Sequence, residues 1–135
     1  MKIAIRYYSR GGNTKKIADA IAGAAGVEAK TVAEPLAEDV DVLFLGTAPY
    51  AFDVDDAVKA FVKGIHVSVG KVIIFSTSAA VKSIRKYVEK LFAEKNIPVA
   101  EEEFSCRGSF GVLHKGRPNA DDQKAAANFA RKNIS

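Results

Sequence analysis

The chain has 135 residues and a formal net charge of +4, and 48% of its residues are hydrophobic. This length predicts a single domain over residues 1–135, and the hydrophobic content is sufficient for a packed core. No apolar run approaches the roughly 18 residues that a membrane-spanning helix needs, so we expect no membrane association. Because the sequence has no basic-then-apolar leader, we expect a cytoplasmic protein.

Metal sites and nucleic-acid binding are also not expected. Cys106 is the single cysteine, so it cannot form an intramolecular disulfide, and we expect a buried, reduced thiol. Cys106 and the distant His66 and His114 do not have metal-ligand spacing. The basic residues are scattered and lack the interleaved aromatic side chains of a nucleic-acid-binding stripe.

Apolar periodicity predicts strands that alternate with helices along the chain. Residues 33–39 are too short and too interrupted by Pro35 for a long helix, and they hold a single turn at most. Residues 76–78 are expected to form a short polar loop, and residues 106–118 an irregular segment. The expected strands are at residues 3–8, 27–32, 40–45, 71–75 and 97–105, and the expected helices at 14–25, 53–65, 79–95 and after Asn119, which should cap the last one.

This order of elements predicts an α/β fold with a doubly wound, five-stranded parallel sheet that carries helices on both faces. The crossover connections should be right-handed. Short, unbroken apolar strands such as residues 72–75 are typical of a sheet that is buried on both faces. The loops that follow the strands should converge at the carboxyl edge of the sheet.

The stretch Ser9-Arg10-Gly11-Gly12-Asn13-Thr14 lies between the first strand and the first helix. The first amides of a helix point outward without partners, and the helix dipole adds positive potential, so such a turn suits a phosphate. The two glycines let the backbone approach an oxyanion closely, and the neighbouring polar side chains add donors. The alternative is that Asn13 only caps the helix after a glycine turn.

Several other functional classes do not fit the sequence. A dinucleotide fingerprint needs G-x-G-x-x-G after the first strand, and a P-loop needs four residues between its glycine and Gly-Lys. Five residues separate Gly64 from Gly70, and the latter opens a strand. A receiver domain needs acidic residues after the first strand, where Tyr7 and Tyr8 stand. The spacing supports no Ser-His-Asp or Cys-His arrangement, so we expect no catalytic side chain.

Residues 9–14 resemble the phosphate loop of flavodoxins, commonly Thr/Ser-x-Thr-Gly-Asn-Thr, at five of its six positions. The resemblance extends over the whole chain, with five strands, a phosphate loop after the first, and recognition loops after the third and fourth. Residues 104–108 and 116–119, followed by a closing helix, also resemble small single-domain members of the flavodoxin superfamily. The resemblance implies the strand order 2-1-3-4-5, with FMN at the switch point between the first and third strands.

The resemblance further implies that three loops bind FMN non-covalently. The first would hold the phosphate, and the second would flank the isoalloxazine ring, with an aromatic side chain stacked on a ring face. The third would bond the ring edge or the ribityl chain. The implied cofactor-binding residues are Ser9, Arg10, Gly11, Gly12, Asn13, Thr14, Thr47, Ala48, Pro49, Tyr50, Ala51, Phe52, Ser76, Thr77 and Ser78.

Three departures from the flavodoxin pattern bear on function. Gly11 stands where a hydroxyl residue is usual, which removes one phosphate donor, although the Arg10 guanidinium can offset this loss. Flavodoxins are usually strongly acidic, whereas this chain is basic, so an ordinary flavodoxin partner is not expected. The loop after the third strand lacks the glycine or asparagine that electron carriers often place beside the flavin.

We therefore expect an FMN-binding electron-transfer protein of flavodoxin type, with a redox protein or a small acceptor as its partner. A redox carrier is favoured over a substrate-specific oxidoreductase, because the chain lacks the added segments by which larger reductases dimerise. One alternative is an FMN-dependent two-electron reductase of quinone-like acceptors, which the loop after the third strand favours. The other is a flavin-free, flavodoxin-like binding module, which Gly11 and the basic charge favour.

Overall fold

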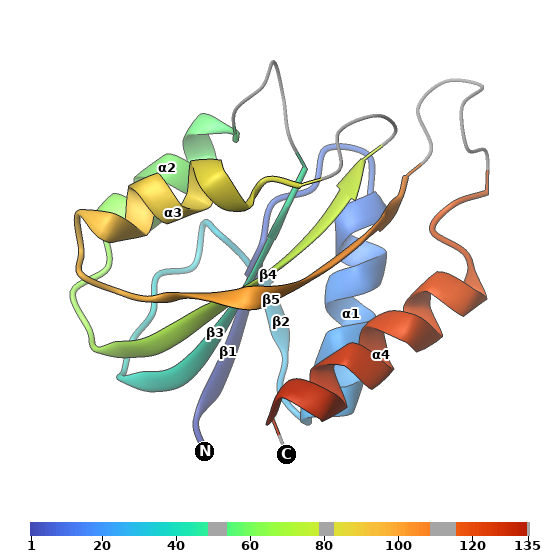
Figure 1. Ribbon diagram of the computed structural model, residues 1–135, viewed down its shortest axis with the longest axis horizontal. Coiled ribbons are helices and arrows are strands. Elements are labelled where there is room, and N and C mark those ends of the chain that lie inside the picture. Colours follow the sequence, from blue (N-terminus) through green and yellow to red (C-terminus); the bar gives the residue numbers. More distant parts are fainter. Residues whose placement is uncertain (49–53, 79–82, 109–115, 135) are drawn as a thin grey trace.

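Five parallel strands form one sheet in the order β2-β1-β3-β4-β5 (Figure 1). The computed structural model describes residues 1–48, 54–78, 83–108 and 116–134. The observed strand order confirms the predicted α/β fold and its topology. The strands are β1 (Ile3–Tyr7), β2 (Ala29–Thr31), β3 (Val40–Thr47), β4 (Val69–Ser78) and β5 (Val99–Arg107).

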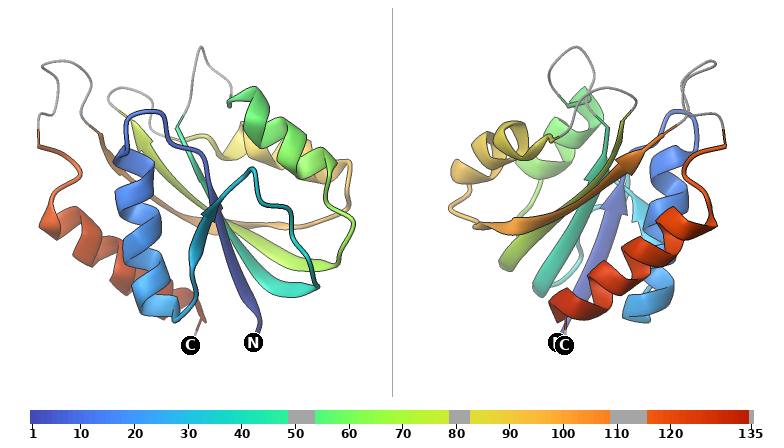
Figure 2. Two further views of the ribbon diagram at one scale, coloured as in Figure 1. Left: turned by 180° about the vertical axis from the view of Figure 1, so that it is seen from behind. Right: turned by 45° about the vertical axis from the view of Figure 1, so that its right-hand side comes forward.

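Helices cover both faces of the sheet, as the doubly wound fold requires. Helices α1 (Asn13–Ala25) and α4 (Ala120–Ile134) lie together on one face (Figures 1 and 2). Helices α2 (Asp56–Lys63) and α3 (Arg85–Ala93) lie on the other. Within the described residues, no helix has the length and the apolar character that a membrane crossing needs.

The alternation of side chains along the central strands divides the core between these two faces. In β3, Val42 and Phe44 face α1 and α4, whereas Leu43 and Leu45 face α2 and α3. All four side chains are at most 1% exposed. Such a strand is apolar on both sides, which is why its sequence is a continuous hydrophobic run.

Strands β3, β4 and β5 extend further toward the carboxyl edge than the sequence predicts. Gly46 does not end β3; instead, a Cβ atom there would lie 2.1 Å from the Phe75 ring, so close packing requires the glycine. The prediction of a polar loop at residues 76–78 is wrong, because these residues continue β4 and pair with β5. The last strand likewise continues to Arg107, so Cys106 lies in a strand and not in an irregular segment. Backbone pairing with neighbouring strands overrides the polar composition here.

Two helices begin later than the sequence predicts. Helix α2 begins at Asp56, because the carboxylate of Asp55 accepts a hydrogen bond from a first-turn amide at 2.9 Å. Helix α3 begins two residues after Ser83, whose hydroxyl accepts the first N–H of the helix at 3.2 Å. The expected starts at residues 53 and 79–82 lie outside the described residues.

The last helix begins as predicted, after Asn119. The side-chain oxygen of Asn119 accepts a hydrogen bond from the N–H of Asp122 at 3.0 Å, and the Asp122 carboxylate accepts one from the N–H of Asn119 at 2.9 Å. This reciprocal pair is a capping box. Arg117 donates from Nη2 to the same carboxylate at 2.6 Å and holds the pKa of Asp122 below its usual value.

The connection between β2 and β3 contains a turn and no helix, as predicted. The N–H of Glu34 donates to the carbonyl of Thr31 at 3.1 Å. The Arg6 side chain is only 8% exposed, and it donates from Nε to the Glu34 carbonyl at 2.8 Å and from Nη2 to the Pro35 carbonyl at 3.3 Å. A buried arginine therefore fixes the path of this connection over β1.

Candidate functional site

The carboxyl edge of the sheet brings together the start of α1 and the ends of β3, β4 and β5 (Figure 1). Strand β1 pairs with β2 on one side and with β3 on the other, so the direction in which strands are added reverses at β1. Ligands of open parallel sheets bind outside the carboxyl ends of the strands at such a switch point. The described members of the predicted site all lie at this edge.

The turn between β1 and α1 contains a glycine in a left-handed conformation. Gly12 occupies the N-cap position of α1 with φ of 91°, a conformation that glycine adopts without strain. Its N–H donates to the hydroxyl of Ser9 at 2.9 Å. The alternative in which Asn13 caps the helix is wrong, because Asn13 is the first helical residue and α1 has no side-chain cap.

The first turn of α1 also contains no acidic residue. The first hydrogen bond of the helix runs from the N–H of Lys16 to the carbonyl of Gly12, at 3.2 Å. The amides of Thr14 and Lys15 therefore come before the first intrahelical bond, and no carboxylate of the first turn competes for them. A bound anion at this position would gain from both the amides and the helix dipole.

Two buried hydroxyls connect this turn to the fourth strand. The Oγ1 atoms of Thr14 and Thr77 are 2.9 Å apart, and both residues are 2% exposed. The hydroxyl of Thr14 thus has a partner within the protein, and its role in this structure is to fix the start of α1 against β4.

Gly108, which follows β5, packs against the start of α1 and the end of β4. A Cβ atom at Gly108 would lie 2.9 Å from Nδ2 of Asn13 and 3.3 Å from Cβ of Thr77. The residue after β5 therefore approaches the predicted phosphate turn as closely as a glycine allows. No local sequence signal assigns Gly108 to the site, because the contact joins residues that are far apart along the chain.

An ion pair joins the other side of the turn to α2. Nη2 of Arg10 lies 2.7 Å from Oδ2 of Asp55. The pKa of Asp55 is held below its usual value, first by the hydrogen bond from the N–H of Ala57, then by Arg10, with a smaller contribution from the hydroxyl of Tyr8. The predicted phosphate ligand Arg10 is thus engaged with the N-terminus of α2 in this structure.

The other described members of the predicted site lie at the ends of β3 and β4. Thr47 is fully buried, and its hydroxyl donates to the carbonyl of Ala48 at 3.3 Å. Ser76 is 2% exposed, whereas Ser78 is partly exposed at the end of β4. The predicted ring-binding residues Pro49, Tyr50, Ala51 and Phe52 lie outside the described residues.

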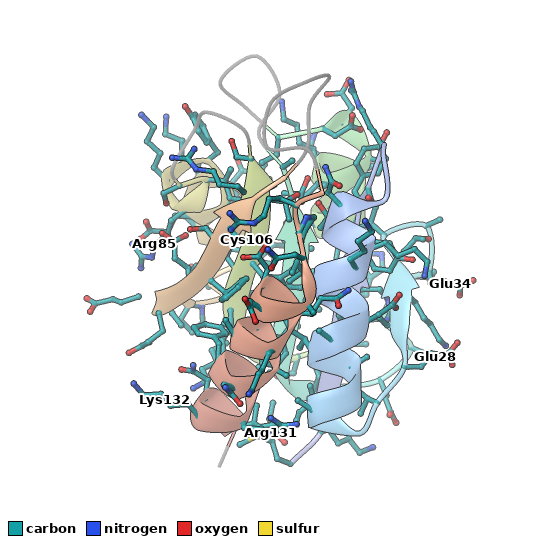
Figure 3. The ribbon with its side chains drawn as sticks, turned by 90° about the vertical axis from the view of Figure 1, so that its right-hand side faces the viewer. Glu28, Glu34, Arg85, Cys106, Arg131 and Lys132 are labelled. Atoms are coloured by element: carbon teal, nitrogen blue, oxygen red, sulfur yellow. The ribbon has the colours of Figure 1, made fainter. Side chains whose placement is uncertain are left out.

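The single cysteine lies beside this edge. Cys106 is half-buried near the end of β5 and close to the start of α4 (Figure 3). Burial raises the pKa of its thiol to about 12. A thiol that keeps its proton is a poor nucleophile, in agreement with the expected reduced and unreactive cysteine.

Comparison with known proteins agrees with this fold. The flavodoxin-domain family model matches residues 4–110. A search of curated proteins gives no match.

Among solved structures, the chain is similar to flavodoxin 1 of Bacillus cereus, with 17% identity, a TM-score of 0.72 and full coverage of both chains. It is also similar to flavodoxin 2 of that organism, with 21% identity and a TM-score of 0.70 over 96% of this chain and 95% of that one. A flavodoxin from the domain Archaea gives 12% identity and a TM-score of 0.72 over 98% and 95%. The chain belongs to the flavodoxin family.

Proposed function

We propose that this protein binds FMN non-covalently and transfers electrons through it. The observation that carries the proposal is the N-terminus of α1, which has a glycine N-cap, no side-chain cap and no acidic residue in its first turn. A phosphate monoester fits such a position, because the amides and the helix dipole both favour an anion. When bound, the isoalloxazine ring of FMN supplies reversible electron uptake and release.

The residues at this edge have distinct roles in the proposal. The hydroxyl of Ser9 accepts the N–H of Gly12 and keeps its own hydrogen for a phosphate oxygen. Gly108 and Thr77 contact the first residues of α1 and fix the position of the helix start. Thr47 to Phe52 and Ser76 to Ser78 would adjoin the ring and the ribityl chain, mainly through backbone groups where the side chains are buried.

The charge of the chain bears on the proposed partner. The formal net charge is +4, which favours encounter with a negatively charged redox protein or a small anionic acceptor. The flavin would perform the redox chemistry, and the chain would bind it, orient it and limit its contact with water. No side chain of the described residues is proposed as an acid, a base or a nucleophile.

A flavin-free binding module is the second candidate, and one observation favours it. Two of the predicted phosphate donors already have partners within the protein, since Arg10 is paired with Asp55 and the Thr14 hydroxyl with Thr77. If these contacts are permanent, the turn has lost part of its phosphate-binding capacity. The edge would then bind another molecule or a protein.

Titration of the flavin-free protein with FMN, followed by flavin fluorescence, tests the proposal. We expect saturable one-to-one quenching that the variant Ser9→Ala weakens several-fold, because the phosphate loses the hydroxyl that would donate to it and the turn loses the hydrogen bond that positions Gly12. The matched control Ser68→Ala removes an exposed hydroxyl outside this edge and should bind as the wild type does. Absence of quenching would favour the flavin-free module. If FMN binds, a redox titration then separates a carrier from a two-electron reductase.

A further inference from the structure

A cavity of about 720 Å³ begins at the proposed phosphate turn, where Ser9 and Gly12 line it, and extends away from that turn. It adjoins β1 and β2 on the face of the sheet that carries α2 and α3. The segment that follows β2 lies on the same side of the sheet as helix α2 (Figure 2). Because residues 32–39 contain no helix, this part of the sheet has no helical cover of its own. The apolar walls are formed by Val32, Leu36, Ala57, Ala60, Phe61 and Ile65.

The wall formed by residues 33–36 is held in place by hydrogen bonds. The buried guanidinium of Arg6 donates to the carbonyls of Glu34 and Pro35, and Nη1 donates to the carbonyl of Ile5 at 3.0 Å. Closing the cavity would separate these carbonyls from Arg6 and leave its charge buried without acceptors, which is costly. The cavity is therefore preformed, as small-molecule sites usually are.

Among the described residues, the side chains that line the cavity carry positive charge and no negative charge. Lys15 is the one charged side chain among the described residues that line it, and it lies at the end where Tyr8 and Ser9 provide polar groups. Its ammonium is 2.8 Å from the carboxylate of Asp19, but the two side chains are 57% and 53% exposed. An exposed pair of this kind contributes little, so the ammonium can turn to a ligand carboxylate at small cost.

The size of the cavity limits what can occupy it. The volume falls within the range of roughly 300–1,000 Å³ that is usual for small-molecule sites. A small ligand matches this space.

We propose that this cavity binds a small amphiphile that has an apolar body and one carboxylate, of which a medium-chain fatty acid is the simplest example. The apolar chain would lie between α2 and the 33–36 wall, and the carboxylate would meet Lys15. In the strand order 2-1-3-4-5 the cavity lies over β1 and β2, whereas the proposed flavin ring lies toward β3 and β4. The two ligands would thus meet at the turn after β1, where Ser9 and Gly12 line the cavity, whereas its apolar part lies away from the proposed flavin ring.

Titration of the ¹⁵N-labelled full chain with decanoate, below its micellar concentration, tests the inference by NMR. We expect saturable shifts confined to the amides of the cavity, including those of Leu36, Ala57 and Ala60. Decyltrimethylammonium has the same chain length and the opposite charge, and should bind at least about ten-fold more weakly. Equal affinity for the two probes, or shifts spread over the whole surface, would overturn the proposal.

Variants distinguish this site from nonspecific binding. Ala60 is exposed on α2, so Ala60→Phe should leave the helix intact, fill the cavity and weaken decanoate binding at least ten-fold. The matched control Ala93→Phe adds the same ring to an exposed position of α3 outside the cavity and should have no effect. Lys15→Gln should reduce the preference for decanoate over the cation. Unchanged decanoate binding in a folded Ala60→Phe variant would contradict the proposal, whatever the result with FMN.

Discussion

At the scale of single residues, the site depends on a few buried polar contacts between distant parts of the chain. The hydroxyls of Thr14 and Thr77 are nearly inaccessible to water and bond to each other at 2.9 Å. Neither can exchange this partner for solvent without movement of α1 or β4. Such a pair is costly to break from one side, because the remaining hydroxyl stays buried without a partner.

We expect each of Thr14→Val and Thr77→Val to lower the free energy of unfolding by about 1–3 kcal/mol. The double variant should cost less than the sum of the two, because it leaves no unpaired hydroxyl. Urea unfolding of the four proteins, at equal m-values, measures the coupling. Strictly additive losses would show that the two hydroxyls do not depend on each other.

The second residue-scale prediction concerns Asp55, which both caps α2 and pairs with Arg10. Asp55→Ala removes both interactions and should cost about 1 kcal/mol or more, whereas Asp55→Asn keeps an acceptor for the cap and should cost less. Thermal or urea unfolding at neutral pH provides the comparison.

The same carboxylate should contribute to acid sensitivity. Its pKa is lower in the folded protein than in the unfolded chain, so it stabilises the fold above the unfolded pKa near pH 4, and this contribution is lost as the pH falls further. Asp55→Asn should therefore lose less stability than the wild type between neutral pH and about pH 3. Parallel stability curves for the two proteins over this range would contradict the assignment.

At the scale of secondary-structure elements, the types and order of elements could be predicted from the sequence, whereas their ends could not. Apolar runs identify the strands, because strands buried on both faces of the sheet are continuously apolar. Apolar residues at helical spacing identify the helices, because each helix buries one face against the sheet. The ends depend on pairing and capping. Residues 76–78 are polar, but they extend β4 because the end of β5 pairs with them. The strand expected at residues 40–45 continues through Gly46, which the ring of Phe75 requires at that position.

Gly46→Ala tests this explanation of the glycine. The new methyl group would lie 2.1–2.2 Å from ring atoms of Phe75, so β3 and β4 would have to separate or the ring would have to move. We expect a loss of about 3 kcal/mol in urea unfolding. The control Gly23→Ala has open space inside α1 and should raise stability by about 0.5–1 kcal/mol. Similar effects for both substitutions would show that Phe75 does not constrain Gly46.

The edge strand β5 shows how the sheet avoids pairing with other molecules. Between Val72 and Ile74 of β4, the register against β5 shifts, so extra residues are accommodated in the edge strand. Glu101 and Glu102 are exposed there. Bulges and charged side chains are both features that discourage pairing at an edge.

Replacement of both glutamates by valine should increase self-association. The variant Glu101→Val/Glu102→Val removes the charge repulsion and raises the β-propensity of the exposed edge. Light scattering after size exclusion should show a larger mean mass than for the wild type at equal concentration. An unchanged mass would indicate that the bulge alone protects the edge.

At the scale of the whole molecule, the topology places the predicted site at the switch between β1 and β3, and the local sequence alone was enough to predict a phosphate turn there. Contacts that depend on the folded chain were not predictable in this way. Gly108 meets Asn13 from the opposite end of the sequence, and Arg10 meets Asp55 across two loops. Neither pair has a local signal, since each requires the final arrangement of strands.

The measurement that tests the central claim most directly is calorimetric titration of the flavin-free protein with FMN and, in parallel, with riboflavin. The two ligands share the ring and the ribityl chain and differ in the phosphate, which the N-terminus of α1 is proposed to hold. We predict one-to-one binding of FMN that is about a hundredfold tighter than that of riboflavin. Equal affinities, or no binding of either ligand, would contradict the account.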